Sequence, residues 1–553
     1  MLLSTAGVLL QLLASASPQD ARLLRDARTA QVRFESVRRM HLPRDWHGGS
    51  GGACDARIGR YCYWYDSTET PPVPEPPRIT EARDRLLSIL DSSAARNPGD
   101  AWIAGQRTRY LIEAGRADEA AAVARACDAE RWWCSALEGL ALHVSDRYAA
   151  ADSAFGIALE AMPEAQRCEW LDLHLLVTDR VSREISRAPC DQQGPIAQRL
   201  WTLGQPLWST PGNDLRTEHF ARLTMAAILA RSANAHGLTW GDDSRELLIR
   251  YGWAEWFTRQ EAGPSLYASP AITGHDREPS FYFFPDVKSA RNGIRISPES
   301  WALRMPTARS RYAPRHLKGL SGLSHQLVRL PRGDSMLLAT AFEIRDTALA
   351  RDSVVARIVA YRHGELRVAE PRTGALWTAL SLPNDSAIAS IEVLGVTSKH
   401  AARARYTIDP LPRIQGAALS DLLLFDPSRG YSGADFGTLM SEALTADRIS
   451  ARAPLGVYWE IEGAARSAPA WISLTVEPIR VSLPRRMATR LHLAQPAAPV
   501  RLRWQSMIQK LLENQSVVLR LPPGARGRYR VVLTVEPYGG SPLTTSREIE
   551  LVP

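Results

Sequence analysis

The segment from Trp240 to Phe257, "WGDDSRELLIRYGWAEWF", combines three tryptophans with two adjacent aspartates and two glycines. Aromatic rings beside carboxylates can build a ligand site, or they can form a domain core that is entered by a charged turn. We interpret Asp242 and Asp243 as part of a turn that leads into a strand. Adjacent side chains on a strand point to opposite faces, so these two would not face each other as a catalytic pair.

The simplest role for this segment is structural. One aspartate would accept backbone N–H groups in the turn, and Trp240, Trp253 and Trp256 would fill the core between a helix and a sheet. Ligand contact and catalysis are the alternatives. Catalysis would need a third group, for which the candidates are Glu246, Glu255 and His275.

The residues upstream predict a turn and a long helix. Ser209–Asn213 is rich in turn-forming residues, and Asp214–Ala233 has the apolar spacing of an amphipathic helix. Followed by a tryptophan, an acidic turn and "IRYG", this series resembles the GWxTD domain. That domain is known from exported bacterial proteins and has no established activity.

The resemblance singles out five candidate ligand or motif residues, which are Trp240, Asp242, Asp243, Tyr251 and Gly252. Trp240 and Asp243 take the motif's tryptophan and aspartate positions, and Ile249–Gly252 matches its following strand. The chain departs from the motif at Thr239, at Asp242 and at Trp253–Glu255. The resemblance covers residues 200–285 and implies an α/β module that closes with the strand "SFYFFP".

Two stretches before this module resemble each other. Tyr110–Cys127 and Leu142–Pro163 each predict a helix, a short polar turn and an alanine-rich second helix. They resemble the tetratricopeptide repeat, with Phe155 and Pro163 at its aromatic and helix-ending positions and Ala124 in place of the aromatic in the first copy. Such repeats usually offer a concave face to a protein partner. The alternative is a purely structural stack of helical hairpins.

The second half of the chain predicts β-structure. Alternating or short apolar runs recur with turn residues between them, as in two all-β sandwiches of immunoglobulin-like type. The predicted strands include 335–344, 353–362, 366–371, 389–396, 404–409, 455–463, 471–479, 516–524 and 527–537.

The N-terminus predicts export. An apolar stretch, Ala6–Leu13, leads into Ala14-Ser15-Ala16, a small-x-small cleavage pattern, so residues 1–16 are predicted to be a signal peptide. The stretch is too short to span a bilayer as a helix. We expect no transmembrane segment after it, and the oligomeric state stays open.

The cysteines also favour export. They are Cys54, Cys62, Cys127, Cys134, Cys168 and Cys190. An even number beside a signal peptide favours disulfides, and we predict that each cysteine pairs with its neighbour in the sequence, although other connectivities stay open. The alternative is a metal site formed by His41, His47, Cys54 and Cys62, whose spacings do not match structural zinc.

Charge and motifs restrict the possible functions. The net charge is +8, but the arginines are scattered among acids and no basic run contains interleaved aromatics, so we expect no nucleic-acid partner. The sequence lacks a Walker loop, a dinucleotide-binding motif, a nucleophile elbow and an H-E-x-x-H motif. We therefore expect no cofactor, no metal and no catalytic residue.

The sequence thus predicts an exported multidomain protein. After the signal peptide (1–16) we expect a cysteine-containing segment with a proline-rich linker (17–79), a tetratricopeptide-like α-helical domain (80–198), a GWxTD-like α/β module (199–310) and two immunoglobulin-like sandwiches (311–440 and 441–553). We expect a non-enzymatic binding or scaffold protein that meets protein partners through its helical repeats at the bacterial cell envelope, in the periplasm or outside the cell. The alternatives are a hydrolase with an acidic site in the GWxTD-like module, and carbohydrate binding by Trp459, Trp471 or Trp504 on a sandwich.

Overall fold

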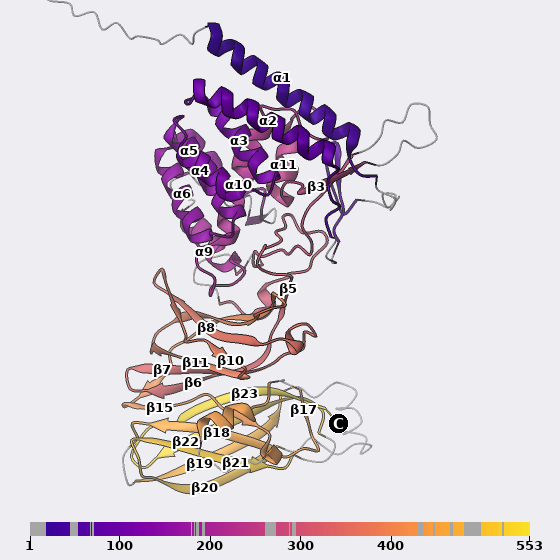
Figure 1. The fold of residues 1–553 in the computed structure, drawn as a ribbon. Coiled ribbons are helices and arrows are strands. Elements are labelled where there is room, and N and C mark those ends of the chain that lie inside the picture. Colours follow the sequence, from indigo (N-terminus) through magenta and orange to yellow (C-terminus); the bar gives the residue numbers. More distant parts are fainter. Residues whose placement is uncertain are drawn as a thin grey trace, which may run out of the picture. The chain divides into compact units, whose positions relative to one another are not determined.

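Figure 1 shows the computed structural model, which describes residues 18–44, 54–66, 68, 71–177, 180, 181, 183, 187, 189, 190, 194–259, 272–286, 288, 289, 295–429, 435–445, 448–464, 468–479, 499–521 and 525–552. The predicted signal peptide lies outside these residues. The chain divides into two compact units. Unit 1 comprises Met1–Pro206, Thr210–Ile294 and Trp301–His316, and unit 2 comprises Leu207–Ser209, Arg295–Ser300 and Leu317–Pro553.

Unit 1 is mainly helical, and unit 2 is rich in β-sheet, which confirms the predicted order of a helical region followed by a β-region. The helices of unit 1 are α1 (Pro18–His41), α2 (Pro77–Arg96), α3 (Ala101–Glu113), α4 (Ala117–Arg125), α5 (Arg131–Val144), α6 (Tyr148–Ala161), α7 (Glu164–Leu171), α9 (Gly194–Gly204), α10 (Asp214–Leu229) and α11 (Asp242–Tyr251). Its strands form two hairpins, β1 (Ala56–Ile58) with β2 (Tyr61–Tyr63) and β3 (Trp256–Arg259) with β4 (Ile272–His275).

Local sequence signals explain where several of these helices begin. Pro77 is the first residue of α2. The N–H groups of the first helical turn have no partner within the helix, so a proline, which lacks this group, is well tolerated there. The Asp100 side chain accepts a hydrogen bond from the backbone N–H of Ile103 at the start of α3. Asn213 caps α10 in the same way by accepting from Arg216.

The helices α2 to α6 pack against one another in chain order, and α3 also contacts α5. Gly139 of α5 lies so close to α6 that a Cβ there would be 2.8 Å from the Phe155 ring. The helix α10 packs against α3, α5 and α6, and it is buried over most of its surface. The face shared by α3 and α5, which a helical repeat would offer to a partner, is therefore covered in part by a helix of this chain.

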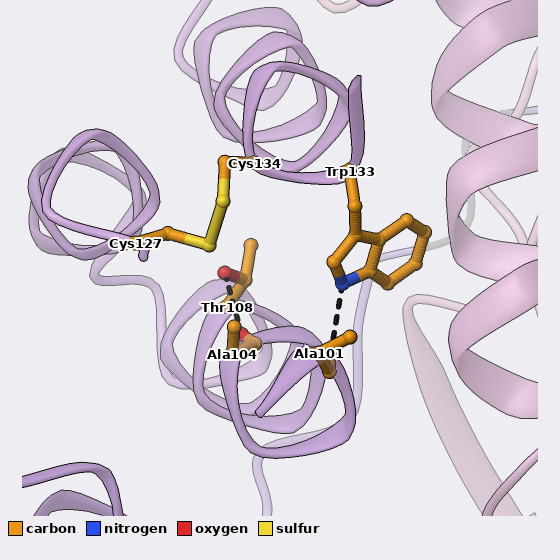
Figure 2. Close-up of a disulfide and its surroundings, with 6 residues drawn as sticks. All are labelled: Ala101, Ala104, Thr108, Cys127, Trp133 and Cys134. Atoms are coloured by element: carbon orange, nitrogen blue, oxygen red, sulfur yellow. Dashed lines mark hydrogen bonds between the residues drawn. A yellow bond between two sulfur atoms is a disulfide. The ribbon is translucent and has the colours of Figure 1, made fainter. Parts of the chain in front are cut away.

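Three disulfides have the predicted pairing, Cys54–Cys62, Cys127–Cys134 and Cys168–Cys190. Figure 2 shows the second of them, which joins the end of α4 to the first turn of α5 beside α3. The Cys54–Cys62 bond excludes these two sulfurs as thiolate metal ligands. The alternative metal site also included His41 and His47. Of these two, His47 lies outside the described residues.

The strands of unit 2 are β5 (Gly319–Gly322), β6 (Ser324–Arg332), β7 (Ser335–Glu343), β8 (Val354–Arg362), β9 (Glu365–Val368), β10 (Arg372–Thr373), β11 (Trp377–Pro383), β12 (Ala387–Gly395), β13 (His400–Ile408), β14 (Arg413–Ile414), β15 (Ala417–Leu419), β16 (Leu423–Phe425), β17 (Arg448–Ser450), β18 (Leu455–Glu462), β19 (Ala468–Pro478), β20 (Val500–Ile508), β21 (Leu512–Leu519), β22 (Gly527–Pro537) and β23 (Leu543–Val552). A short helix, α12 (Phe436–Ser441), accompanies them.

These strands form four sheets within the described residues. Their orders are β10-β8-β12-β13-β5 with β9 also on β8, β11-β7-β6, β14-β15-β18-β16 with β21 also on β18, and β17-β23-β22-β19-β20. Most neighbouring strands are antiparallel, but β5 runs parallel to β13, and β17 runs parallel to β23.

Hydrophobic cores join successive sheets of this unit. Because alternate residues of a strand face opposite sides, β7 contributes Leu338 to the core shared with β8 and β12, and Ala339 to the core shared with β16 and α12. A third core lies between the last two sheets and includes Trp459 and Leu533. Strands β15 and β16 precede residue 440 but pair with β18, so strands from both predicted sandwiches share one sheet.

The three sandwich tryptophans differ in exposure. Trp459 is fully buried, and Trp504 packs against it with ring centroids 6.2 Å apart. Trp471 is 45% exposed, and the guanidinium of Arg503 lies 4.9 Å from the centroid of its ring. Of the three, Trp471 alone offers an exposed ring. Among the described residues we find no helix with both the length and the hydropathy of a membrane-spanning segment.

Candidate functional site

The segment Asp242–Tyr251 forms the helix α11, so the predicted strand at Ile249–Gly252 is wrong. Both ends of the segment carry helix signals. Asp242 and Asp243 lie in the first turn, where the helix dipole favours acids, and Gly252 follows the last residue. The predicted strand "SFYFFP" is also wrong, because there the structure has only an isolated bridge from Phe281 to Tyr312. Within the described part of 199–310 the strands are β3 and β4.

Asp243 fastens the N-terminal hairpin to α11. Its two carboxylate oxygens accept hydrogen bonds from Arg60, from Nε at 2.7 Å and from Nη2 at 2.8 Å. The Arg60 hydrogen bonds hold the pKa of Asp243 well below its usual range. Gly59 lies at the tip of the β1–β2 hairpin, and a Cβ there would be 2.5 Å from the Cβ of Asp243. This aspartate therefore has a structural anchoring role.

The other end of α11 is held by a buried ionic network. Arg222 of α10 donates from Nη1 to the carbonyl oxygens of Ile249 and Arg250, the last turn of α11, where carbonyls lack helical partners. Glu218 accepts from Arg222 Nε at 2.6 Å, and its other oxygen lies 2.7 Å from His143 Nε2. Although burial opposes ionisation of Glu218, Arg222 and His143 lower its pKa to about 2.

The two motif candidates at the end of the helix, Tyr251 and Gly252, lie at the same end of α11. Tyr251 is buried and stacks on Tyr63 of β2, with ring centroids 3.8 Å apart. Gly252 has a φ of +99°, which L side chains rarely adopt, and a Cβ there would also lie 3.3 Å from Arg222. Both residues therefore shape the turn that leads out of α11.

An aromatic pocket opens beside this turn. It has a volume of about 100 Å³, and its lining includes Trp240, Trp253, Phe257, Tyr61 and His236. Trp240 and Trp253 are half-buried, whereas Trp256 is buried, so of the three tryptophans predicted to fill a core, one does so and two line the pocket.

The rings of this pocket hold one another in place. His236 lies 6.0 Å from Tyr61 and 5.5 Å from Phe257 between ring centroids, edge to face in both cases. Burial lowers the pKa of His236, and its Nδ1 lies 3.2 Å from the carbonyl oxygen of Ile272, so a neutral ring donates there. The walls are therefore largely aromatic, and the lining also includes the ion pair of Arg109 and Glu113.

A smaller, charged pocket lies on the other side of Gly252 and Trp253. Its volume is about 40 Å³, and its lining includes Glu218, Glu255, Asp276 and Arg315. Glu255 is held between Arg315 at 2.6 Å and Arg277 at 3.2 Å. Burial and the charge of Glu278 raise the pKa of Asp276 to about 8, so this carboxyl is largely protonated at neutral pH.

The sequence hypotheses named some of these residues and missed others. Trp240 lies in the aromatic pocket, and Glu255 lies in the charged one. Asp242 is exposed at the start of α11, and Glu246 pairs with Arg250 at 2.8 Å. The remaining candidate, His275, stacks on Trp256. Asp276, which follows β4 and lines the charged pocket, was not foreseen.

The described residues hold no cluster of three or more side chains suited to a metal ion. No protein-family model matches this sequence, and no curated protein matches it. The comparisons therefore do not identify a GWxTD domain or a tetratricopeptide repeat in this chain.

Proposed function

We propose that the chain is an exported, non-enzymatic protein of the bacterial cell envelope that binds a protein partner at the aromatic pocket beside α11. The observation that carries this proposal is the pocket itself, where Trp240 and Trp253 remain half-buried and leave room for an apolar side chain. Burial of aromatic surface in a preformed pocket is a frequent source of binding free energy at interfaces.

The wider architecture supports the proposal. The three disulfides are typical of proteins that mature outside the reducing cytoplasm. The hairpins α3–α4 and α5–α6, with the contact of Gly139 and Phe155, suit a tetratricopeptide-like stack. Because α10 covers the face shared by α3 and α5, we place the partner at the α11 pocket rather than in a repeat groove.

The β-region suits immunoglobulin-like sandwiches that display or space the binding unit. In the last two sheets, β18 pairs with β21, and β17 runs parallel to β23 at the edge of the facing sheet. Such an arrangement of two sheets around one core is typical of that architecture. The GWxTD resemblance is carried by Trp240 and Asp243, which lie at the pocket and at the hairpin anchor.

A co-purification experiment tests this function. The full chain is used to capture partners from envelope extract, and the double variant Trp240→Ala, Trp253→Ala is compared with Leu238→Ala, an exposed neighbour outside the pocket. We expect the double variant to lose the proteins that the parent captures and Leu238→Ala to retain them. Equal capture by both variants would contradict the proposal.

The charged pocket supports a second candidate, a hydrolase. Burial raises the pKa of Asp276 to about 8, and a carboxyl that is protonated near neutrality can act as a general acid. Glu255 lines the same pocket and pairs with Arg315 and Arg277. If this candidate is correct, hydrolysis of ester or glycoside substrates should fall as pH rises through about 8, and Asp276→Asn should abolish it. Absence of hydrolysis by the parent protein on both substrate classes would dismiss it.

A further inference from the structure

A third pocket in unit 1 is roomier than the two beside α11. It has a volume of about 240 Å³, which suits a small ligand rather than a single ordered water. Helices α3, α5, α7 and α10 all contribute to its lining, which includes Trp102, Trp132, Trp133, Gln106, Gln166 and Glu130. Ala227 and Ile228 in the last turn of α10 belong to this lining.

The tryptophans of this pocket are fixed in position. Trp102 Nε1 donates to the carbonyl oxygen of Arg231, and Trp133 Nε1 donates to that of Ala101, as Figure 2 shows for the second bond. Both indole N–H groups are thus used within the protein, and both residues are buried, with 5% and 7% of their surface exposed. Trp132 is half-buried and stands edge to face with Trp133, with centroids 5.5 Å apart.

Polar groups stand among these rings. Gln106 is 1% exposed, and its Nε2 donates to Ile228, but its Oε1 accepts no hydrogen bond. A buried amide oxygen without a donor is unfavourable, so a hydroxyl or amide donor from a ligand would be favoured there. Gln166 and the carboxylate of Glu130 provide further polar groups in the lining.

A disulfide supports the wall of the pocket. Glu130, Trp132 and Trp133 all lie within or beside the loop that the Cys127–Cys134 bond closes, and Figure 2 shows this bond beside Trp133. Gly105 lies opposite, where a Cβ would be 3.1 Å from the Trp133 ring and 3.3 Å from Ile228. The disulfide therefore closes the segment that carries Trp133, and the missing side chain at Gly105 lets α3 lie close to the Trp133 ring.

We propose that this pocket binds a neutral sugar ring, with its C–H face on Trp132 and its hydroxyls toward Gln106, Gln166 and Glu130. A sugar presents both an apolar face and hydroxyl donors, and a site of aromatic rings with a few placed polar groups matches both. This site is separate from the protein-binding pocket of the proposed function and from the sandwich tryptophans.

Titration of the oxidised full chain with glucose, N-acetylglucosamine and their β-1,4-linked disaccharides tests the proposal. We expect at least one of them to bind. Trp132→Ala and the pocket-filling Ala227→Phe should each weaken that binding at least tenfold, and Trp471→Ala, an exposed tryptophan of unit 2, should leave it unchanged. Circular dichroism checks that each variant folds.

Three outcomes would overturn the proposal. They are no binding of any of the four sugars, unchanged binding by both pocket variants, and equal loss in Trp471→Ala. Trp240→Ala should leave sugar binding intact, so failure of this proposal and failure of the proposed function are distinguishable.

Discussion

At the scale of single residues, Asp243 anchors the β1–β2 hairpin to α11, and Trp240 and Trp253 line the aromatic pocket. The sequence resemblance pointed to Trp240 and Asp243, and both make defined contacts. The partner of Asp243 could not be predicted, because Arg60 lies 183 residues earlier in the chain. The raised pKa of Asp276 was equally out of reach, since burial by other segments causes it.

Asp243→Asn tests the anchoring role. Loss of the carboxylate weakens the paired hydrogen bonds to Arg60, so the β1–β2 hairpin should detach more often from α11. Limited proteolysis should then cut within residues 54–66 faster than in the parent. Asp242→Asn is the matched control, because Asp242 is exposed, and it should leave the rate unchanged. Equal rates in the two variants would refute the anchor.

Asp276→Asn tests the charged pocket through pH. The pKa of Asp276 is about 8 in the folded protein and near 4 in the unfolded chain. Its protonated carboxyl therefore contributes fully to stability below about pH 4, and this contribution is lost as the pH rises toward 8. The Tm of the parent should therefore fall more between pH 5 and pH 8 than the Tm of the variant does. Parallel Tm curves for the parent and Asp276→Asn would contradict the raised pKa.

At the scale of elements, the sequence predicted α10 and strands such as β7, β8, β18 and β22, but it misassigned α11 and did not foresee α1. In α11 the short run "IRYG" was matched to a strand, although acids in the first turn and Gly252 after the last are helix signals. In α1 the buried face carries Gln31, Glu35 and Arg38, so apolar periodicity is weak. These side chains are paired with α3, where Arg109 donates to Glu35 at 2.7 Å.

The junction of α10 with α11 gives a prediction at this scale. Glu218→Gln removes the charge between His143 and Arg222 and leaves a buried cation without its partner, which should cost about 3–5 kcal/mol of unfolding free energy. Chemical denaturation measures the loss. Glu246→Gln, which breaks the more exposed pair with Arg250, should cost about 0.5 kcal/mol or less. Similar losses for the two variants would show that the buried network around Glu218 stabilises the protein no more than an exposed ion pair does.

At the scale of the whole molecule, the order of a helical region before a β-region and the neighbour pairing of the cysteines were predictable. The layering of unit 2 was not, because β15 and β16 pair with a strand more than thirty residues later, as with Leu423 and Tyr458. All the cysteines precede residue 191, so every disulfide belongs to unit 1. Reduction should therefore lower the melting transition of the helical unit and leave that of the β-unit in place, since each disulfide contributes about 2–4 kcal/mol. Calorimetry with and without reductant checks this, and equal shifts of both transitions would contradict it.

The most direct test of the central claim is site-specific photo-crosslinking of the full chain in envelope extract. A photoreactive aromatic residue replaces Trp240 inside the aromatic pocket, or Leu238 on the exposed surface two residues earlier. If a partner inserts a side chain beside α11, position 240 should give a discrete crosslinked protein, and position 238 should give little or none. Absence of a crosslink at 240, or the same product at both positions, would contradict binding at this pocket.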